Sequence, residues 1–264
     1  MKPAVPPVCS GQLKENCILF WRVWRGKEAH VSGRSAMAQP NQTPGTITDF
    51  VAEQLRNRIV LGVLRPGRKV PVYELADELG VSRVPLREAV RQLEAESLVD
   101  NLPRRGTVVR ELSVRDLRDS FAILQAVEPV AAHRAAESGD PTILRDMEYW
   151  LGQMQELTDR RVPEVSEEML HAHRAFHFAL FRAAGEGVLH RHLCMLWNTC
   201  ERYVMNSLPN SERQAAAAIE HAELVKRIRA GDLDGIDEVL RGHLEASLTS
   251  SLRYLEDSGV AADS

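Results

Sequence analysis

The feature that most constrains this chain is the order of sequence patterns between Val70 and Val109. A short helical pattern ends at Gly80, and a second helical pattern follows within a few residues. Two β-rich segments come next, joined by a basic turn at residues 104–106. The expected inward-facing residues are Val72, Leu75, Ala76 and Leu79 in the first helix and Leu86, Ala89, Val90 and Leu93 in the second. The order helix, tight turn, helix and β-hairpin predicts a winged helix-turn-helix.

The second of these helices carries a stripe of arginines. Arg83, Arg87 and Arg91 are spaced four residues apart, so they share one face, opposite the apolar face. Guanidinium groups on a helix of this width suit the DNA major groove, where they pair with guanine edges or with phosphates. Arg104 and Arg105 would add contacts from the turn. For Arg91 and Arg104, a solvated surface charge is an equally good interpretation.

Charge is distributed unevenly along the chain, whose net charge is −4. Residues 1–45 carry +4, residues 46–112 carry +1 and residues 113–264 carry −9. DNA binding would therefore depend on local clustering of arginines, and the acidic remainder needs another role. No apolar run approaches the ~20 residues of a membrane span. The four cysteines form no CxxC pair, which favours the reducing cytoplasm.

Four segments are predicted. Residues 1–45 are proline-rich without a sustained period and are expected to be disordered; translation starting at Met37 is an alternative. Residues 46–112 form the winged helix-turn-helix, 113–257 a helical domain and 258–264 a tail. The expected helices span residues 48–64, 114–138, 141–158, 164–184, 187–206, 210–230 and 233–257. Short breaks between the later helices favour an antiparallel all-helical bundle, so the fold class is mainly α.

Histidines in the second domain fall on inward-facing stripes of three expected helices. His173 and His177 are spaced i, i+4 on one helix, while His221 and His243 lie on two others. A buried imidazole needs a partner, and one metal ion would serve several imidazoles at once. Zn²⁺ accepts four nitrogen ligands, and Ni²⁺, Co²⁺, Fe²⁺ or Mn²⁺ are alternatives. Hydrogen-bonded core histidines are the other interpretation.

The chain resembles GntR-type transcription regulators of the FadR subfamily, which carry an FCD ligand-sensing domain. The family phrase LGVSRxPxREALRxLExxGLV stands here as LGVSRVPLREAVRQLEAESLV, followed by PRRGTVV. The resemblance covers residues ~48–257. It implies that the VSR segment, with Ser82 and Arg83, and Arg87 contact DNA, and that the wing around Arg105-Gly106 enters the minor groove. The family's glycine before Leu-Val is Ser97 here.

The second half resembles the FCD pattern DxxFHxxL, followed by a histidine on each of two later helices. The resemblance implies a divalent metal held by one aspartate and three histidines. The aspartate position is His173 in this chain, and the histidines match His177, His221 and His243. Four histidines would favour Zn²⁺ or Ni²⁺ over harder cations. An altered or empty site is the alternative.

Two further departures concern the effector. Many family members carry an arginine four residues before the Glu128 position, where it holds a ligand carboxylate; this chain has Leu124. A common asparagine is replaced by Glu186. Both departures leave the identity of the effector open.

Together these features predict a homodimeric regulator, a repressor in the family's usual sense, that binds a double-stranded DNA operator. The helical domain would hold a small effector, such as a carboxylate, beside the metal and so alter operator binding. Alternatives are a metal-responsive regulator, a constitutive DNA-binding protein and, less favoured, a metal-dependent enzyme. The sequence has no nucleophile motif or phosphate loop, so we do not expect an enzyme.

Overall fold

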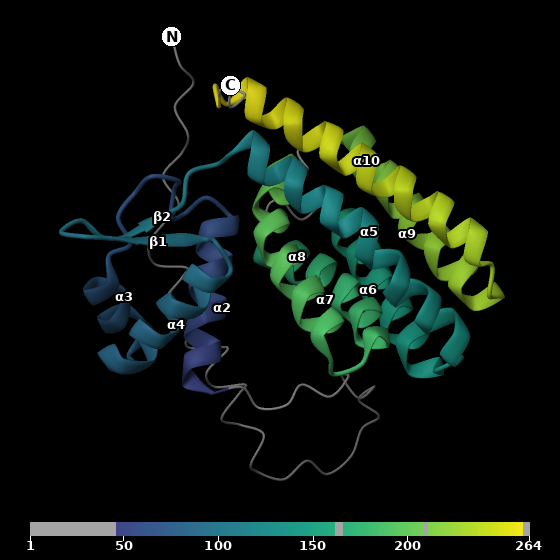
Figure 1. The fold of residues 1–264 in the computed structure, drawn as a ribbon, viewed down its shortest axis with the longest axis horizontal. Coiled ribbons are helices and arrows are strands. Elements are labelled where there is room, and N and C mark those ends of the chain that lie inside the picture. The colour runs from purple at the N-terminus through teal and green to yellow at the C-terminus, as the bar shows by residue number, and fades with distance from the viewer. Residues whose placement is uncertain (1–45, 162–165, 208–210, 261–264) are drawn as a thin grey trace.

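The structure, a computed structural model, describes residues 46–161, 166–207 and 211–260. The expectations for residues 1–45, including the alternative start at Met37, lie outside these ranges. Figure 1 shows a small N-terminal unit beside a larger bundle of helices. In the described ranges, every helix is too short or too polar to cross a membrane.

The N-terminal unit is the expected winged helix-turn-helix. Its helices are α2 (Ile47–Val60), α3 (Val72–Leu79) and α4 (Arg83–Ala95). Strands β1 (Val99–Leu102) and β2 (Gly106–Val109) pair antiparallel and form the wing. All eight predicted inward positions are buried or half-buried, and most of them join one apolar core with α2.

Helix α2 begins as predicted but ends earlier. The hydroxyl of Thr46 accepts a hydrogen bond from the Asp49 amide, and the Asp49 carboxylate accepts one from the Thr46 amide. This reciprocal capping box satisfies amides that the first turn leaves unpaired. The predicted end at residue 64 was wrong because the chain turns at Gly62, whose φ of 71° is incompatible with a continuing helix.

Helix α4 ends where the chain departs from the family phrase. Ser97 has a φ of 57°, in the left-handed region that favours glycine. Its amide bonds to the Glu94 carbonyl, and the Leu98 amide bonds to the Leu93 carbonyl. This is the hydrogen-bond pattern of a Schellman ending, in which glycine is the usual residue. A glycine at this position would adopt the left-handed conformation without strain, which explains the glycine of the family phrase. In this chain, Ser97 adopts that conformation at a cost.

The C-terminal domain consists of long helices joined by short turns. They are α5 (Val114–Ser138), α6 (Pro141–Asp159), α7 (Glu167–Phe181), α8 (Val188–Ser207), α9 (Ser211–Ala230) and α10 (Leu233–Asp257). Five of the six agree with the expected ranges to within one residue. The predicted 164–184 helix is shorter at both ends. It begins at Glu167, where the Ser166 hydroxyl caps it by accepting a hydrogen bond from the Met169 amide, and its last turn is a 3₁₀ helix over Arg182–Ala184.

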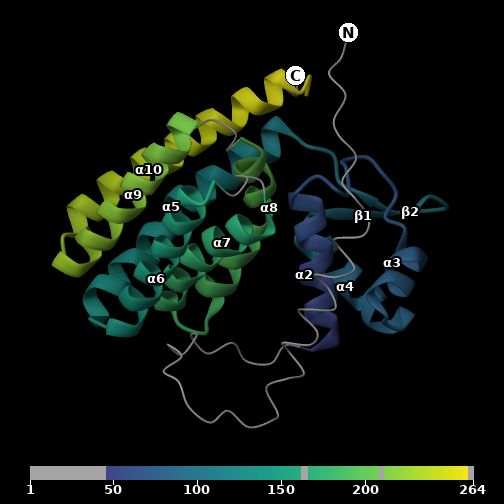
Figure 2. The same cartoon turned by 180° about the vertical axis from the view of Figure 1, so that it is seen from behind.

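The bundle surrounds one large apolar core. Helix α5 runs through its middle, with α10 and α9 on one side and α7 and α8 on the other (Figures 1 and 2). Its buried stripe includes Leu117, Phe121, Leu124, Ala131 and Ala135, and Glu128 is the ionisable residue within it. The fold class predicted from the sequence is confirmed.

The two domains are joined through α8. The Asn206 amide donates to the Val60 carbonyl at the end of α2, at 2.8 Å. The guanidinium of Arg202 donates to the backbone carbonyl of Arg110, and the Thr199 hydroxyl donates to that of Glu96, both at 2.9 Å. Helix α8 therefore contacts the DNA-binding unit at the C-terminal ends of α2 and α4 and just after β2.

Candidate metal centre and nucleic-acid interface

The arginine stripe of α4 lies on the protein surface. Arg83, Arg87 and Arg91 are exposed, opposite the buried face of the helix. The Arg83 guanidinium stacks over the Tyr73 ring at 4.8 Å, which holds it near the start of the helix. Arg91 is paired with Glu88 at 2.8 Å. Arg83 and Arg87 are thus exposed on the face of α4 opposite the domain core, and Arg91 has an acidic neighbour.

The tip of the wing is basic and exposed. Arg104 and Arg105 project at the turn between β1 and β2, and Gly106 begins β2 with a φ of 79°. Arg104 also has a positive φ, of 65°, which costs an ordinary residue ~1 kcal/mol or more. Ser82 precedes α4 and is exposed as well. All seven expected DNA-binding residues therefore lie on the surface of the N-terminal unit.

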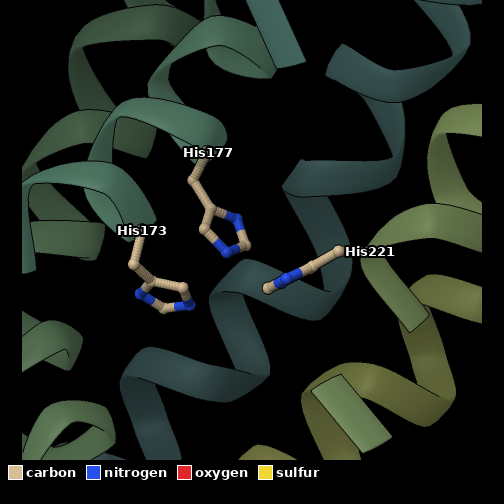
Figure 3. A group of neighbouring side chains, drawn as sticks. All are labelled: His173, His177 and His221. Atoms are coloured by element: carbon tan, nitrogen blue, oxygen red, sulfur yellow. The ribbon is translucent and has the colours of Figure 1, made fainter. Parts of the chain in front are cut away.

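Three of the four expected metal ligands converge in the bundle interior. His173 and His177 come from α7 and His221 from α9, and their rings point toward one another (Figure 3). One ligand nitrogen from each lies within 4.8 Å of the others. All three side chains are buried, with at most 6% exposed. Zn–N bonds of ~2.0–2.1 Å hold ligand nitrogens ~3.3 Å apart, so small movements of the rings would bring these nitrogens to one cation.

His243, the fourth expected ligand, stands beside this group. Its ring centroid lies 4.7 Å from that of His221 and 5.9 Å from that of His177. Its Nδ1 lies 2.7 Å from a carboxylate oxygen of Glu220, which orients the ring, and Arg213 contacts the same nitrogen at 3.3 Å. The described residues thus form a three-histidine cluster with His243 at its edge, rather than four equivalent ligands.

Burial keeps these imidazoles neutral. It lowers the pKa of His173 to about 3, with a further contribution from His243. Burial and the neighbouring histidines place the pKa of His177 and of His221 well below the usual value. Neutral imidazole is the form that binds metal, so the cluster offers ligands without prior loss of protons.

Four of the six ring nitrogens of the cluster are buried without a hydrogen-bond partner. Among the described residues, His173 Nδ1, His221 Nε2 and both ring nitrogens of His177 are buried without a hydrogen bond. A buried polar atom left unpaired costs ~1–3 kcal/mol, and several at one point call for a common explanation. The donor set, nitrogen only, fits a borderline cation such as Zn²⁺ or Ni²⁺.

Two neighbours of the cluster were missed by sequence reasoning. Glu128 of α5 is fully buried, and its Oε1 lies 3.4 Å from His177 Nδ1 without forming a hydrogen bond. Burial raises the pKa of Glu128 to about 8. Its place on the apolar stripe of α5 is the pattern that could have identified it. Trp197 of α8 stacks on His177, with ring centroids 3.8 Å apart, and no spacing in the sequence indicated that contact.

A second acidic residue near the cluster, Glu220, has a lowered pKa, in contrast to the raised pKa of Glu128. Partial burial opposes its ionisation, but hydrogen bonds from His243 and Arg213 outweigh that effect and bring its pKa to about 2. The site therefore has one carboxyl that is neutral at pH 7 and one that is charged. Leu124, at the position where the family resemblance led us to expect an arginine, is fully buried in the apolar core and offers no charge to a ligand.

A chain of contacts leads from the cluster to the DNA-binding unit. The indole nitrogen of Trp197 donates to Glu201 Oε1 at 3.3 Å. The guanidinium of Arg174, next to His173 on α7, pairs with the buried Glu201 carboxylate and donates to Asn57 Oδ1 of α2 at 3.0 Å. We call this chain, from Trp197 through Glu201 and Arg174 to Asn57, the interdomain relay.

Fold and site together define a protein with a winged helix-turn-helix and a helical domain that contains a buried histidine cluster. Residues 47–109 match the model of the bacterial regulatory proteins of the gntR family, and residues 119–246 match the FCD domain. A probable D-xylose utilization operon transcriptional repressor from Paenarthrobacter nicotinovorans is 31% identical over 76% of this chain and 88% of its own. The chain therefore belongs to the GntR family of transcriptional regulators and carries an FCD domain.

Other known proteins agree with this assignment. The HTH-type transcriptional regulator BphR of Paraburkholderia xenovorans is 29% identical over 77% of this chain and 84% of its own. The structure of McbR (YncC) from E. coli superposes with a TM-score of 0.69 at 21% identity, over 79% of this chain and 98% of the other. At that identity the superposition shows a shared fold.

Proposed function

We propose that this GntR-family regulator is a repressor whose helical domain senses a small effector beside a divalent metal ion. The observation that carries the proposal is the set of unpartnered ring nitrogens of His173, His177 and His221, buried within 4.8 Å of one another. Buried polar atoms in native proteins are nearly always paired, so a missing partner is the simplest account.

His173, His177 and His221 would hold the ion, and His243 would complete a four-nitrogen set after a small movement of its ring. Bound there, Zn²⁺ or Ni²⁺ would act as a Lewis acid that accepts an oxygen from a carboxylate effector. His243 bonds to Glu220 through Nδ1, so its Nε2 can face the ion. Glu128 would orient His177 in the same way, since its Oε1 lies 3.4 Å from His177 Nδ1. Such carboxylate partners fix the orientation of ligand histidines.

The effector would act on DNA binding through α7 and α8. Helix α7 carries two ligands on one face and Arg174 on another, and Arg174 reaches Asn57 of α2. A shift of α7 or of Trp197 would therefore move the contact between the domains. The two DNA-binding units of a dimer would have two relative arrangements, of which one fits the operator. An effector that binds the other arrangement more tightly would lower the affinity of the protein for the operator.

The DNA contacts follow from the exposed residues of α4 and the wing. Arg83 and Arg87 would enter the major groove, with Ser82 at the helix start, and Arg91 would reach a phosphate. Arg104, Arg105 and Gly106 would contact the adjacent minor groove. One such unit reads only a few base pairs, so a homodimer on a palindromic site is expected. The name of the Paenarthrobacter relative supports the repressor sense.

A metal-responsive regulator is the second candidate. The observation in its favour is Leu124, buried in the core where an effector-binding arginine would stand. In that case the ion itself would change operator affinity, without an organic ligand.

Operator binding measured by fluorescence anisotropy separates these functions. The protein would be stripped of metal, then titrated with a DNA fragment from its own promoter region alone, with Zn²⁺ or Ni²⁺, and with the ion plus a panel of organic acids. We expect binding that an acid weakens only in the presence of the ion. The variant His173→Ala/His177→Ala should lose this response, while His192→Ala, an exposed control, should keep it. A response to the ion alone would favour the second candidate, and a response that survives the double substitution would refute the site.

A further inference from the structure

A cavity lies between the two domains, and we call it the interdomain cavity. Helices α2 and α4 of the DNA-binding unit contribute to one wall, and α6, α7 and α8 of the bundle to the other (Figures 1 and 2). Its volume is about 420 Å³, which lies within the ~300–1,000 Å³ range of small-molecule sites. The described residues that line it include none of the four expected metal ligands, so the cavity is separate from the histidine cluster.

The arginines of the interdomain cavity are already compensated. Each of the three that line it is paired with a carboxylate outside the lining, in the pairs Arg56–Glu96, Arg174–Glu201 and Arg182–Asp146. Asp146 also lies 3.3 Å from Arg145, which is largely exposed and therefore screened by water. The guanidinium groups thus offer hydrogen-bond donors to a ligand but little unbalanced positive charge.

The acidic residues of the interdomain cavity are not balanced in this way. The carboxylate of Asp49 accepts a hydrogen bond from the Thr46 amide at 2.8 Å, which lowers its pKa and keeps it ionised at pH 7. Among the described residues, Glu53, one turn further along α2, forms no hydrogen bond or ion pair, and it is half-buried. With the paired carboxylates and Arg145 counted, five carboxylates stand against four guanidinium groups. The surplus negative charge lies on the α2 side.

The bundle side supplies aromatic surface and an unused amide. Asn198 of α8 is only 8% exposed and lines the cavity, and its side chain forms no hydrogen bond with the rest of the described chain. Trp150 and Phe178 provide apolar surface in the same lining. His171 packs edge-on against Trp150, with ring centroids 5.0 Å apart, and is neutral at pH 7 because partial burial lowers its pKa. A buried amide without a partner calls for a ligand or a water that bonds to it.

We propose that the interdomain cavity binds a small aromatic amine. The ammonium group would pair with Glu53, and the ring would lie against Trp150 and Phe178. A polar group at the other end of the ligand would hydrogen-bond to Asn198. A carboxylate beside aromatic rings is a combination that recognises organic ammonium groups. A carboxylate ligand would instead be repelled by Glu53 and Asp49 and would meet arginines that already have partners.

This site would give the protein a second input, independent of the metal ion. Groups from both domains contact the same ligand, so a bound amine would stabilise the arrangement of the domains described above. Any difference between that arrangement and the one that binds the operator would then couple amine binding to DNA binding.

Isothermal titration calorimetry with tyramine tests the proposal. The full chain, stripped of metal, would be titrated with tyramine and with 3-(4-hydroxyphenyl)propanoate, which has the same phenol but a carboxylate in place of the amine. We expect tyramine to bind with a Kd below ~1 mM and the anion at least ~tenfold more weakly. Glu53→Gln should weaken tyramine binding at least ~tenfold, whereas Glu74→Gln, at an exposed position outside the cavity, should leave it unchanged. No binding of tyramine, equal binding of the anion, or an unchanged Kd in Glu53→Gln would overturn the proposal.

A ligand with one group removed tests the contact with Asn198. Phenethylamine lacks the phenol hydroxyl of tyramine, so it should bind the wild type more weakly than tyramine does. Asn198→Ala should bind the two amines equally, because the group that distinguishes them has lost its partner. A variant that still prefers tyramine as strongly as the wild type does would contradict this contact.

Hydrogen exchange locates the bound amine. Tyramine should slow the exchange of amides in both α2 and α7, and it should not do so in Glu53→Gln. Protection confined to α9 and α10 would place the amine at the histidine cluster and overturn the proposal. Metal content of the same wild-type protein before stripping tests the histidine site separately, so each proposal can fail without the other.

Discussion

Loss of the charge on Glu201 should both destabilise the protein and loosen the contact between its domains. Glu201 is fully buried and accepts hydrogen bonds from the Arg174 guanidinium, with the Nε distances at 2.9 and 3.1 Å. Removing one member of a buried ion pair costs ~3–5 kcal/mol, because the other charge is left without a partner. Glu201→Gln keeps the shape and one acceptor, so we expect ~3 kcal/mol, at the lower end.

Thermal unfolding followed by circular dichroism measures this effect. At ~2–4 °C per kcal/mol for a chain of this size, the Tm should fall by ~6–12 °C. The matched control is Glu148→Gln, which removes an exposed pair with Arg229 and should change stability by ~0–1 kcal/mol. The double variant Arg174→Met/Glu201→Leu should recover much of the loss, since it leaves no buried charge. A Glu201→Gln protein that melts with the wild type would refute the interdomain relay as a structural connection.

Four further outcomes follow. His177→Ala should lose both the bound ion and the stability that the ion confers, ~2.7 kcal/mol at a hundredfold excess over Kd, measured by unfolding with and without Zn²⁺; an equal Zn²⁺ effect in the variant would contradict this. Metal-free protein should lose stability as the pH falls below ~6.5, because His173 is protonated in the unfolded chain but stays neutral in the folded protein down to its pKa of about 3. At pH 5 this residue alone should lower the free energy of unfolding by ~2 kcal/mol, which denaturant titrations at pH 7 and pH 5 would measure. Arg87→Ala should abolish operator binding in anisotropy while the exposed control Arg241→Ala does not, and equal affinities would exclude α4 as the recognition helix. Ser97→Gly should raise the free energy of unfolding by ~1 kcal/mol through relief of its positive φ, and a neutral or lower value would count against strain there.

Periodicity predicted the fold because each element has local signals. The end of α3 at Gly80 and the start of α5 after Ser113 follow from capping and from left-handed glycine, which depend on neighbours in sequence. The end of α2 was predicted too late because the helix ends before Gly62 rather than near residue 64. Gly62 is followed closely by Pro66 and Gly67, and the local sequence pattern did not show which of these residues marks the end of the helix.

The sequence predicted which histidines face the interior of the bundle, but it did not predict how close together their rings lie. Helical spacing places His173 and His177 on one face, yet only the packing of α9 brings His221 to them. The position of His243 depends on Glu220 and Arg213, which hold its ring by side-chain contacts that no periodicity encodes. The interdomain relay likewise joins residues far apart in the chain, and such contacts become visible only in the folded molecule.

Elemental analysis tests the central claim most directly. Protein purified without a histidine tag, as wild type and as His173→Ala/His177→Ala, would be supplied with Zn²⁺ and Ni²⁺, desalted and measured for metal per chain. We predict about one ion per chain in the wild type and almost none in the variant. An equal metal content in the two proteins, or no retained ion in the wild type, would contradict the histidine cluster as a metal centre.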